Sequence, residues 1–183
     1  LLVGFGGDGY SVAWHEEAKM RGLKNLRTTP DALPWITNRQ TIKTFSSYGV
    51  LSERELDARF EVFSEQYAVK LNIECETAAE MARTMILPAA VRHLARLRDG
   101  GVEALVAEFE PLVSELHAAI VTLEEVNKAE NQVDDPPIAW AKYMRDKGIP
   151  AMNAVRDIAD RLEKLVSDDL WPLPKYSEML FVR

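Results

Sequence analysis

Apolar residues recur along most of the chain at alternating spacings of three and four, the period of an α-helix with one buried face. Two runs predict long helices, one from Val102 to about Val126 and one from Pro150 to about Val166. Their apolar seams are Val102, Leu105, Phe109, Leu112, Leu116, Ala119, Leu123 and Val126, flanked by Val106, Val113 and Ile120, and then Met152, Val155, Ala159, Leu162 and Val166. Such broad stripes are typical of helical bundles. Pro111 lies off its seam and is expected to kink the first helix.

A longer helical pattern runs from Ser52 to Arg98. It opens with a capping box, in which Ser52 is the N-cap and Glu55 follows three residues later. One straight helix of this length would measure about 70 Å, against about 40 Å for a compact globule of this chain length. We therefore expect a bend at Pro88, which lacks an N–H, and a weaker one at Leu71–Glu74, where the apolar phase slips. The apolar positions are Leu56, Phe60, Phe63, Tyr67, Leu87, Val91 and Leu94.

Shorter helices are predicted elsewhere along the chain. The sequence favours helices from Tyr10 to Gly22, at Thr29–Asp31, from Thr37 to Tyr48, and from Ile138 to Lys147. Glycines follow the last two, and Gly148 is expected to end the Ile138–Lys147 helix.

These elements predict an all-α fold, because no alternating pattern of parallel strands follows any of the helices. The short Asp99-Gly100-Gly101 turn favours antiparallel neighbours. We expect an elongated antiparallel bundle of three to four long helices, with short capping helices and an extended C-terminal tail from Trp171. Residues 1–50 are interpreted as a glycine-rich entry segment with short helices, and residues 51–183 as a helical bundle.

Composition excludes several classes of protein. The 183 residues are 47% hydrophobic and 28% charged, as in a globular protein. A net charge of −7 argues against a nucleic-acid partner or an anionic membrane surface. No apolar run approaches the roughly 18 residues of a membrane span. The single cysteine, Cys75, fits a reducing compartment, so we expect a cytoplasmic protein.

The segment Gly4-Phe5-Gly6-Gly7-Asp8-Gly9 fits a G-x-G-x-x-G phosphate-binding pattern and precedes a predicted helix. A dinucleotide fold also needs a second strand and an acidic residue about 20 positions later. The helix leads instead into Arg27-Thr28-Thr29-Pro30, so a plain turn before a helix is the favoured interpretation.

Other candidate residues lack partners at the spacing that their chemistry needs. His15-Glu16-Glu17 has Lys19 where a zinc site on a helix would place its second histidine. His93 and His117 stand on separate helices, and no local signature makes Cys75 a nucleophile. We therefore expect no catalytic, cofactor-binding or metal-binding residue in this chain. The acidic residues Glu103, Glu108, Glu110, Glu115, Glu124, Glu125 and Glu130 are interpreted as a solvated helix face.

Aromatic residues suggest contacts instead of chemistry. Tryptophans are common in cores and interfaces, and those of this chain are Trp14, Trp35, Trp140 and Trp171. The tail from Trp171 to Phe181 is apolar and predicted to be non-helical, so it needs a surface to lie on, in its own bundle or in a neighbouring subunit.

Several motifs resemble the C-terminal end of type III glutamine synthetases. The resemblance is most specific near the two ends of the chain. It rests on Gly7-Asp8-Gly9-Tyr10-Ser11, Trp14-His15-Glu16-Glu17-Ala18, Arg21-Gly22-Leu23, Asn25, Gly49-Val50, Ser52, Glu55-Leu56, Arg59, Glu61, Tyr67, Ile73-Glu74, Met81, Ile86, Pro88-Ala89, Trp171-Pro172-Leu173-Pro174-Lys175-Tyr176 and Leu180-Phe181.

The resemblance implies a parent enzyme that joins ammonia to glutamate at the expense of ATP, using Mg or Mn, and that assembles as stacked hexameric rings. It also implies that the family's metal-binding and substrate-binding motifs lie upstream. Because the first residue is Leu1, we expect a piece of a longer protein whose helical end packs on its catalytic part and shapes subunit contacts. The alternative is an independent helical module for protein–protein interaction.

Overall fold

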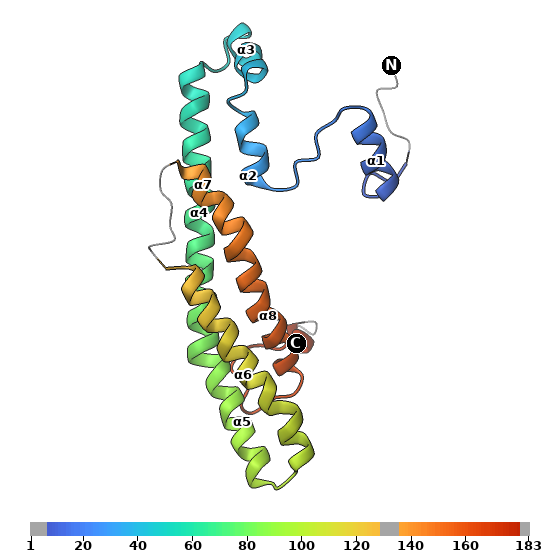
Figure 1. Cartoon of the computed structure of the whole chain (residues 1–183), viewed down its shortest axis with the longest axis vertical. Coiled ribbons are helices and arrows are strands. Elements are labelled where there is room, and N and C mark those ends of the chain that lie inside the picture. Colours follow the sequence, from blue (N-terminus) through green and yellow to red (C-terminus); the bar gives the residue numbers. More distant parts are fainter. Residues whose placement is uncertain (1–6, 129–135, 180–183) are drawn as a thin grey trace. The chain divides into compact units, whose positions relative to one another are not determined.

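The computed structural model describes residues 7–128 and 136–179, and its regular elements are all helical (Figure 1). This confirms the predicted all-α fold. The chain divides into two compact units, Leu1–Phe60 and Glu61–Arg183, and the boundary falls inside helix α4.

The first unit contains short helices: α1 (Val12–Met20), α2 (Thr29–Ala32), the 3₁₀ turn η1 (Leu33–Trp35) and α3 (Arg39–Ser47). Ser11 caps the start of α1 and Asn38 caps the start of α3. The side chain of each accepts a hydrogen bond from a backbone N–H in the first turn of its helix. Gly22 and Gly49 follow the two helices with φ of 73° and 65°, a left-handed conformation that glycine adopts without a Cβ clash. The predicted starts and stops therefore hold to within a few residues.

Helix α4 (Glu53–Met81) begins at the predicted capping box. The Ser52 backbone N–H donates to Glu55 Oε2 at 2.8 Å, and the Glu55 N–H donates to Ser52 Oγ at 3.4 Å. Both orphan N–H groups at the helix start thus find partners. The helix continues through Leu71–Glu74 without interruption, so the slip in the apolar pattern there does not end it.

Just before Pro88, where the sequence predicts a bend, the helix contains a π-helical segment, η2 (Ala82–Ile86), which leads into α5 (Leu87–Asp99). A π turn adds one residue to the helical ring. Proline has no N–H and its ring would clash with a carbonyl of the preceding turn. The wider π turn just before Pro88 leaves room for the proline ring and accommodates the missing N–H.

A second π segment corrects the prediction at Gly148. Helix α7 (Pro137–Tyr143) runs through η4 (Met144–Gly148) directly into α8 (Ile149–Glu163). Gly148 therefore does not end a helix, and its φ of −63° is ordinary helical backbone. As with Pro88, the π turn ends two residues before a proline, Pro150.

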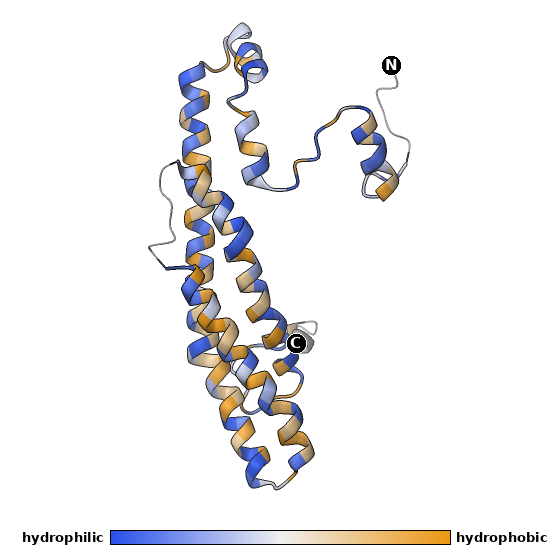
Figure 2. Cartoon of the chain, in the orientation of Figure 1, coloured by the Kyte–Doolittle hydropathy of each residue, from blue (hydrophilic) through white to orange (hydrophobic). Residues whose placement is uncertain are grey.

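Helix α6 (Glu103–Val126) follows the Asp99–Gly101 turn and packs against α5 and α8 (Figures 1 and 2). Pro111 lies inside this helix, which continues through it. The shared core is apolar and spans residues 68–166. Its largest fully buried side chains include Leu116, Ile120, Leu123, Met144 and Leu162. Ile120, which the sequence places at the flank of its seam, lies in this core, whereas Val102 and Leu105 at the helix start are exposed.

Candidate functional site

The predicted tail docks on its own helical unit through residues 170–173. Leu170, Trp171 and Leu173 pack against the core, and only the short helix α9 (Tyr176–Met179) interrupts the extended course that the sequence predicts. Residues 180–183, including the apolar Phe181, lie outside the described residues. The part of the tail that is described thus lies on the bundle of the same chain.

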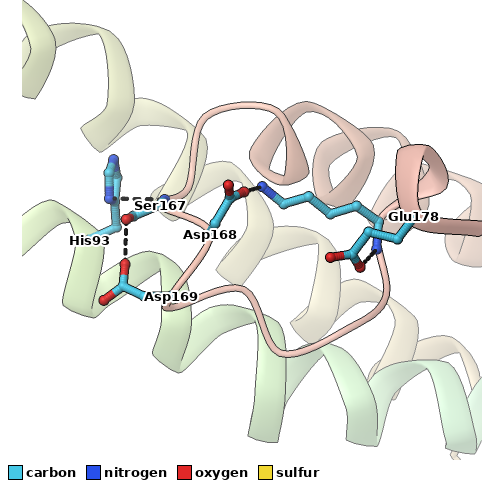
Figure 3. A network of polar contacts seen from close by, with 6 residues as sticks. His93, Ser167, Asp168, Asp169 and Glu178 are labelled. Carbon is cyan, nitrogen blue, oxygen red and sulfur yellow. Dashed lines mark hydrogen bonds and ion pairs between the residues drawn. The ribbon is translucent and has the colours of Figure 1, made fainter. Parts of the chain in front are cut away.

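A polar cluster fastens the segment after α8 to α5 (Figure 3). The Ser167 N–H donates to His93 Nδ1 at 3.4 Å, and Arg96 Nη1 donates to Asp169 Oδ2 at 2.7 Å. The Ser167 hydroxyl also donates to the Asp169 carboxylate, and these bonds hold the pKa of Asp169 below its usual value. Farther along, Lys175 pairs with Asp168. These contacts orient the tail. His93 also borders a cavity of about 240 Å³, whose other lining residues are mostly apolar.

His93 acts in this cluster as a hydrogen-bond acceptor. Its ring lies edge-on to Phe109, with the ring centroids 4.9 Å apart. Burial, and then the positive charge of Arg96, lower the pKa of His93, while Asp169 opposes them. A neutral imidazole can accept the Ser167 N–H bond at Nδ1, whereas the protonated ring carries a hydrogen there. The structure therefore assigns this histidine a structural bond.

Cys75 lies fully buried in the core, where its sulfur faces Gly148. Burial, followed by the nearby charges of Glu74 and Glu76, raises the pKa of its thiol to about 11. The reactive form of cysteine is the thiolate. At neutral pH this side chain is a thiol and behaves as a small apolar residue.

Glu124 pairs with Arg83, a contact that the sequence does not reveal. The Arg83 guanidinium donates from Nε and Nη2 to the two carboxylate oxygens, each at 2.5 Å, and joins η2 to α6. These bonds lower the pKa of Glu124. The pair is separated by 41 positions in sequence, so helical spacing gives no signal for it. Its geometry matches a bidentate structural ion pair.

The remaining candidates lie apart from one another. In the described ranges, 7–128 and 136–179, no three histidine, cysteine, aspartate or glutamate residues come together as metal ligands would. Only Gly7, Asp8 and Gly9 of the glycine-rich segment are described. Trp14 and Trp35 lie beneath the cations of Arg21 and Lys24. In contrast, Trp140 is in the core of the second unit, with Trp171 packed against that core.

Two kinds of surface stand out among the described residues. The first unit leaves many large apolar side chains exposed, among them Tyr10 at 95% and Met20 at 82%. The second unit has an apolar groove of about 380 Å³, lined by Met81, Met152 and Met179 among other residues. In addition, no helix among the described residues is long and apolar enough to cross a membrane. Surfaces of this kind suit packing against protein.

Comparison with known proteins gives a consistent picture. The model of a protein family described as the glutamine synthetase C-terminal domain matches residues 2–103. The chain is 34% identical to a type-3 glutamine synthetase of Dictyostelium discoideum, over 100% of the chain and 27% of that protein. It is 30% identical to a glutamine synthetase of Bacteroides fragilis, over 99% of the chain and 27% of that protein. The chain therefore spans about a quarter of the length of these relatives.

Proposed function

Because the chain belongs to the glutamine synthetase C-terminal domain family, we propose that it is the non-catalytic, helical C-terminal region of such an enzyme. Its role is structural: it packs on the catalytic part and contributes to subunit contacts. One observation carries this proposal, namely that the whole chain aligns with only 27% of a type-3 glutamine synthetase. The catalytic part of the parent enzyme is assigned to the remaining length.

The parent enzyme, in this proposal, joins ammonia to glutamate at the expense of ATP and uses Mg or Mn. The described residues offer no acidic or histidine cluster that fits such a metal. A buried thiol and isolated histidines are likewise poor ligands for these hard cations, which prefer several oxygen atoms. In this proposal, ATP and metal bind to the upstream part of the parent enzyme, and the described residues of this chain supply no set of metal ligands.

Exposed apolar residues in the first unit support its packing on that upstream part. Within residues 7–60 the buried apolar side chains are few: Ala18, Pro30, Leu33 and Leu56. Helix α3 has no buried residue at all. A unit that leaves this much apolar surface in water gains stability by covering it. We accordingly assign residues 1–50 to the end of the catalytic part and residues 51–183 to the helical bundle.

Substitution of exposed apolar residues tests this assignment. In the full-length protein, Met20→Glu should lower the melting temperature by several degrees, because it places a charge in a buried contact. In the isolated 183-residue chain the same change should have almost no effect, since Met20 is exposed there. Lys19→Glu, at an exposed neighbouring position, is the matched control. Equal effects of Met20→Glu on both proteins would contradict packing of this surface on the catalytic part.

The coding sequence upstream of Leu1 separates the two candidate functions. A glutamine synthetase region requires several hundred in-frame codons that encode a metal and nucleotide site. An independent interaction module requires a start codon just before Leu1, and finding one would contradict the proposal.

A further inference from the structure

Within the second unit, helix α4 carries apolar residues on two opposite faces. One face is buried in the core and consists mainly of small residues, Ser64, Ala68, Leu71, Cys75 and Ala79. The other face presents Val62, Val69 and Ile73, which are 46%, 37% and 54% exposed. A helix on the surface of a monomer needs only one apolar stripe. The second stripe therefore calls for a partner.

The spacing of the second stripe is that of a coiled-coil seam. Val62, Gln66, Val69 and Ile73 follow one another at intervals of four, three and four residues. Written as a heptad, Val62 and Val69 occupy d positions, while Gln66 and Ile73 occupy a positions. A polar residue at an a position sets the register between two helices. We call these four residues the outer α4 seam.

Charges beside the outer α4 seam indicate the orientation of the partner. Glu65 falls at a g position and Lys70 at the following e position, on opposite flanks of the seam. In parallel helices a g residue meets the e residue five positions later on the partner, so Glu65 of each copy would face Lys70 of the other. In an antiparallel pair each flank faces itself, and Lys70 would meet no acid. The charges are thus self-complementary in the parallel arrangement only.

We propose that the outer α4 seam is a contact between two copies of this chain, with their α4 helices parallel and in register about a two-fold axis. The proposal rests on the subunit-contact role given above and specifies where one such contact lies. In a two-fold contact the same surface serves both copies, so a self-complementary stripe is the pattern required. Four positions make a short seam, which therefore forms part of a larger contact.

Cross-linking tests the parallel register directly. Gln66→Cys places one thiol per chain at an a position, and in-register a positions face each other across the two-fold axis. Under mild oxidation we expect a covalent dimer of the 183-residue chain. Arg92→Cys, exposed on α5, is the matched control, and the unchanged chain accounts for the buried Cys75. Failure of the Gln66→Cys chain to cross-link faster than the control would overturn the proposal.

A charge exchange tests the predicted pairing independently. Starting from the Gln66→Cys chain, Glu65→Lys or Lys70→Glu alone should slow cross-linking on the order of tenfold, because each replaces two symmetric attractions by repulsions. The double exchange should restore the rate. Equal rates in all three variants would exclude the parallel contact. In the full-length protein, the thiol of Gln66→Cys can also be tested for reaction with a soluble reagent. If it is shielded and no dimer forms, the catalytic part covers the outer α4 seam. That result would overturn this contact and leave the proposed function intact.

Discussion

At Gly148 the absence of a side chain allows close packing of neighbouring residues, whereas the backbone φ is one that any residue can adopt. A Cβ built there would lie 2.9 Å from Met144 Cε and 3.4 Å from Cys75 Sγ. The first distance is shorter than real Cβ contacts, so the end of Met144 would have to move. The sequence suggests a helix stop at this glycine because glycine commonly ends helices. Which of the two roles applies depends on the neighbouring helix, which the sequence pattern does not identify.

Gly148→Val is expected to lower the free energy of unfolding by about 2 kcal/mol, because two branches must enter an already filled space. The helix propensity gained on replacing glycine offsets less than about 1 kcal/mol of this cost. Lys147→Val, at an exposed neighbouring position, should change it by less than about 0.5 kcal/mol. Urea denaturation followed by circular dichroism measures both. Similar values for the two variants would contradict the close packing at Gly148.

His93 gives a second prediction at this scale, through its pH dependence. Its pKa in the folded chain lies below the ordinary value of 6.5, chiefly because of burial. The unfolded chain therefore binds the proton more readily, and stability should fall as the pH drops below about 6.5 toward the folded pKa. The charged groups facing the ring are Arg96, Asp169 and, across a shared cavity, Glu108.

His93→Gln retains an acceptor for the Ser167 N–H and removes the titration. Between pH 7 and pH 5.5, we expect the free energy of unfolding of the His93→Gln chain to decrease less than that of the unchanged chain. Ser114→Gln, at an exposed position of α6 that does not titrate, is the control and should follow the unchanged chain. Chemical denaturation at the two pH values measures the difference. A His93→Gln chain with the same pH dependence as the unchanged chain would show that His93 contributes none of it.

At the scale of elements, small side chains set how α4 packs. The buried face of this helix includes Ala68, Cys75 and Ala79, whereas the apolar seam expected from sequence was Leu56, Phe60, Phe63 and Tyr67. Phe63 is in fact 41% exposed. Large residues dominate a sequence-based search for a seam, so a face of alanines passes unnoticed although it allows close helix packing. The helix and the burial of Leu56 and Tyr67 were predictable from the sequence, but the face of small residues was not.

Ala68→Leu should therefore destabilise the second unit by about 1–3 kcal/mol, since Ala68 is fully buried and a larger side chain overpacks the contact. Ala58→Leu makes the same change at an exposed position of the same helix and should cost less than about 0.5 kcal/mol. Differential scanning calorimetry of the two variants compares them. Equal melting temperatures would contradict the burial of the alanine face.

Prolines explain the other difference at this scale. The sequence predicts a helix stop at Gly148 and a new helix at Pro150, whereas Pro150, like Pro88, lies just after a π segment in a continuous helical run. Sequence rules describe what proline forbids in a regular α-helix. They do not indicate that one extra residue per turn can accommodate it, because that solution depends on packing of the surrounding helices.

At the scale of the whole molecule, the helical fold and the family were both accessible from sequence. When a helix buries one face, its apolar residues recur with the helical period, so the helix can be recognised from the sequence. The motifs near Trp14 and at Trp171-Pro172 carried the family resemblance. The match to residues 2–103 and the 34% identity to a type-3 glutamine synthetase over the whole chain confirm it. Contacts between distant residues, such as Arg83 with Glu124, were not accessible, because they depend on how the helices pack.

Formation of glutamine from glutamate, ammonia and MgATP tests the central claim most directly. It is measured for the full-length protein and for the 183-residue chain alone, together with ATP binding by calorimetry. The account predicts activity and ATP binding for the full-length protein and neither for the isolated chain. Glutamine formation or ATP binding by the isolated chain would contradict it, as would a full-length protein without the activity.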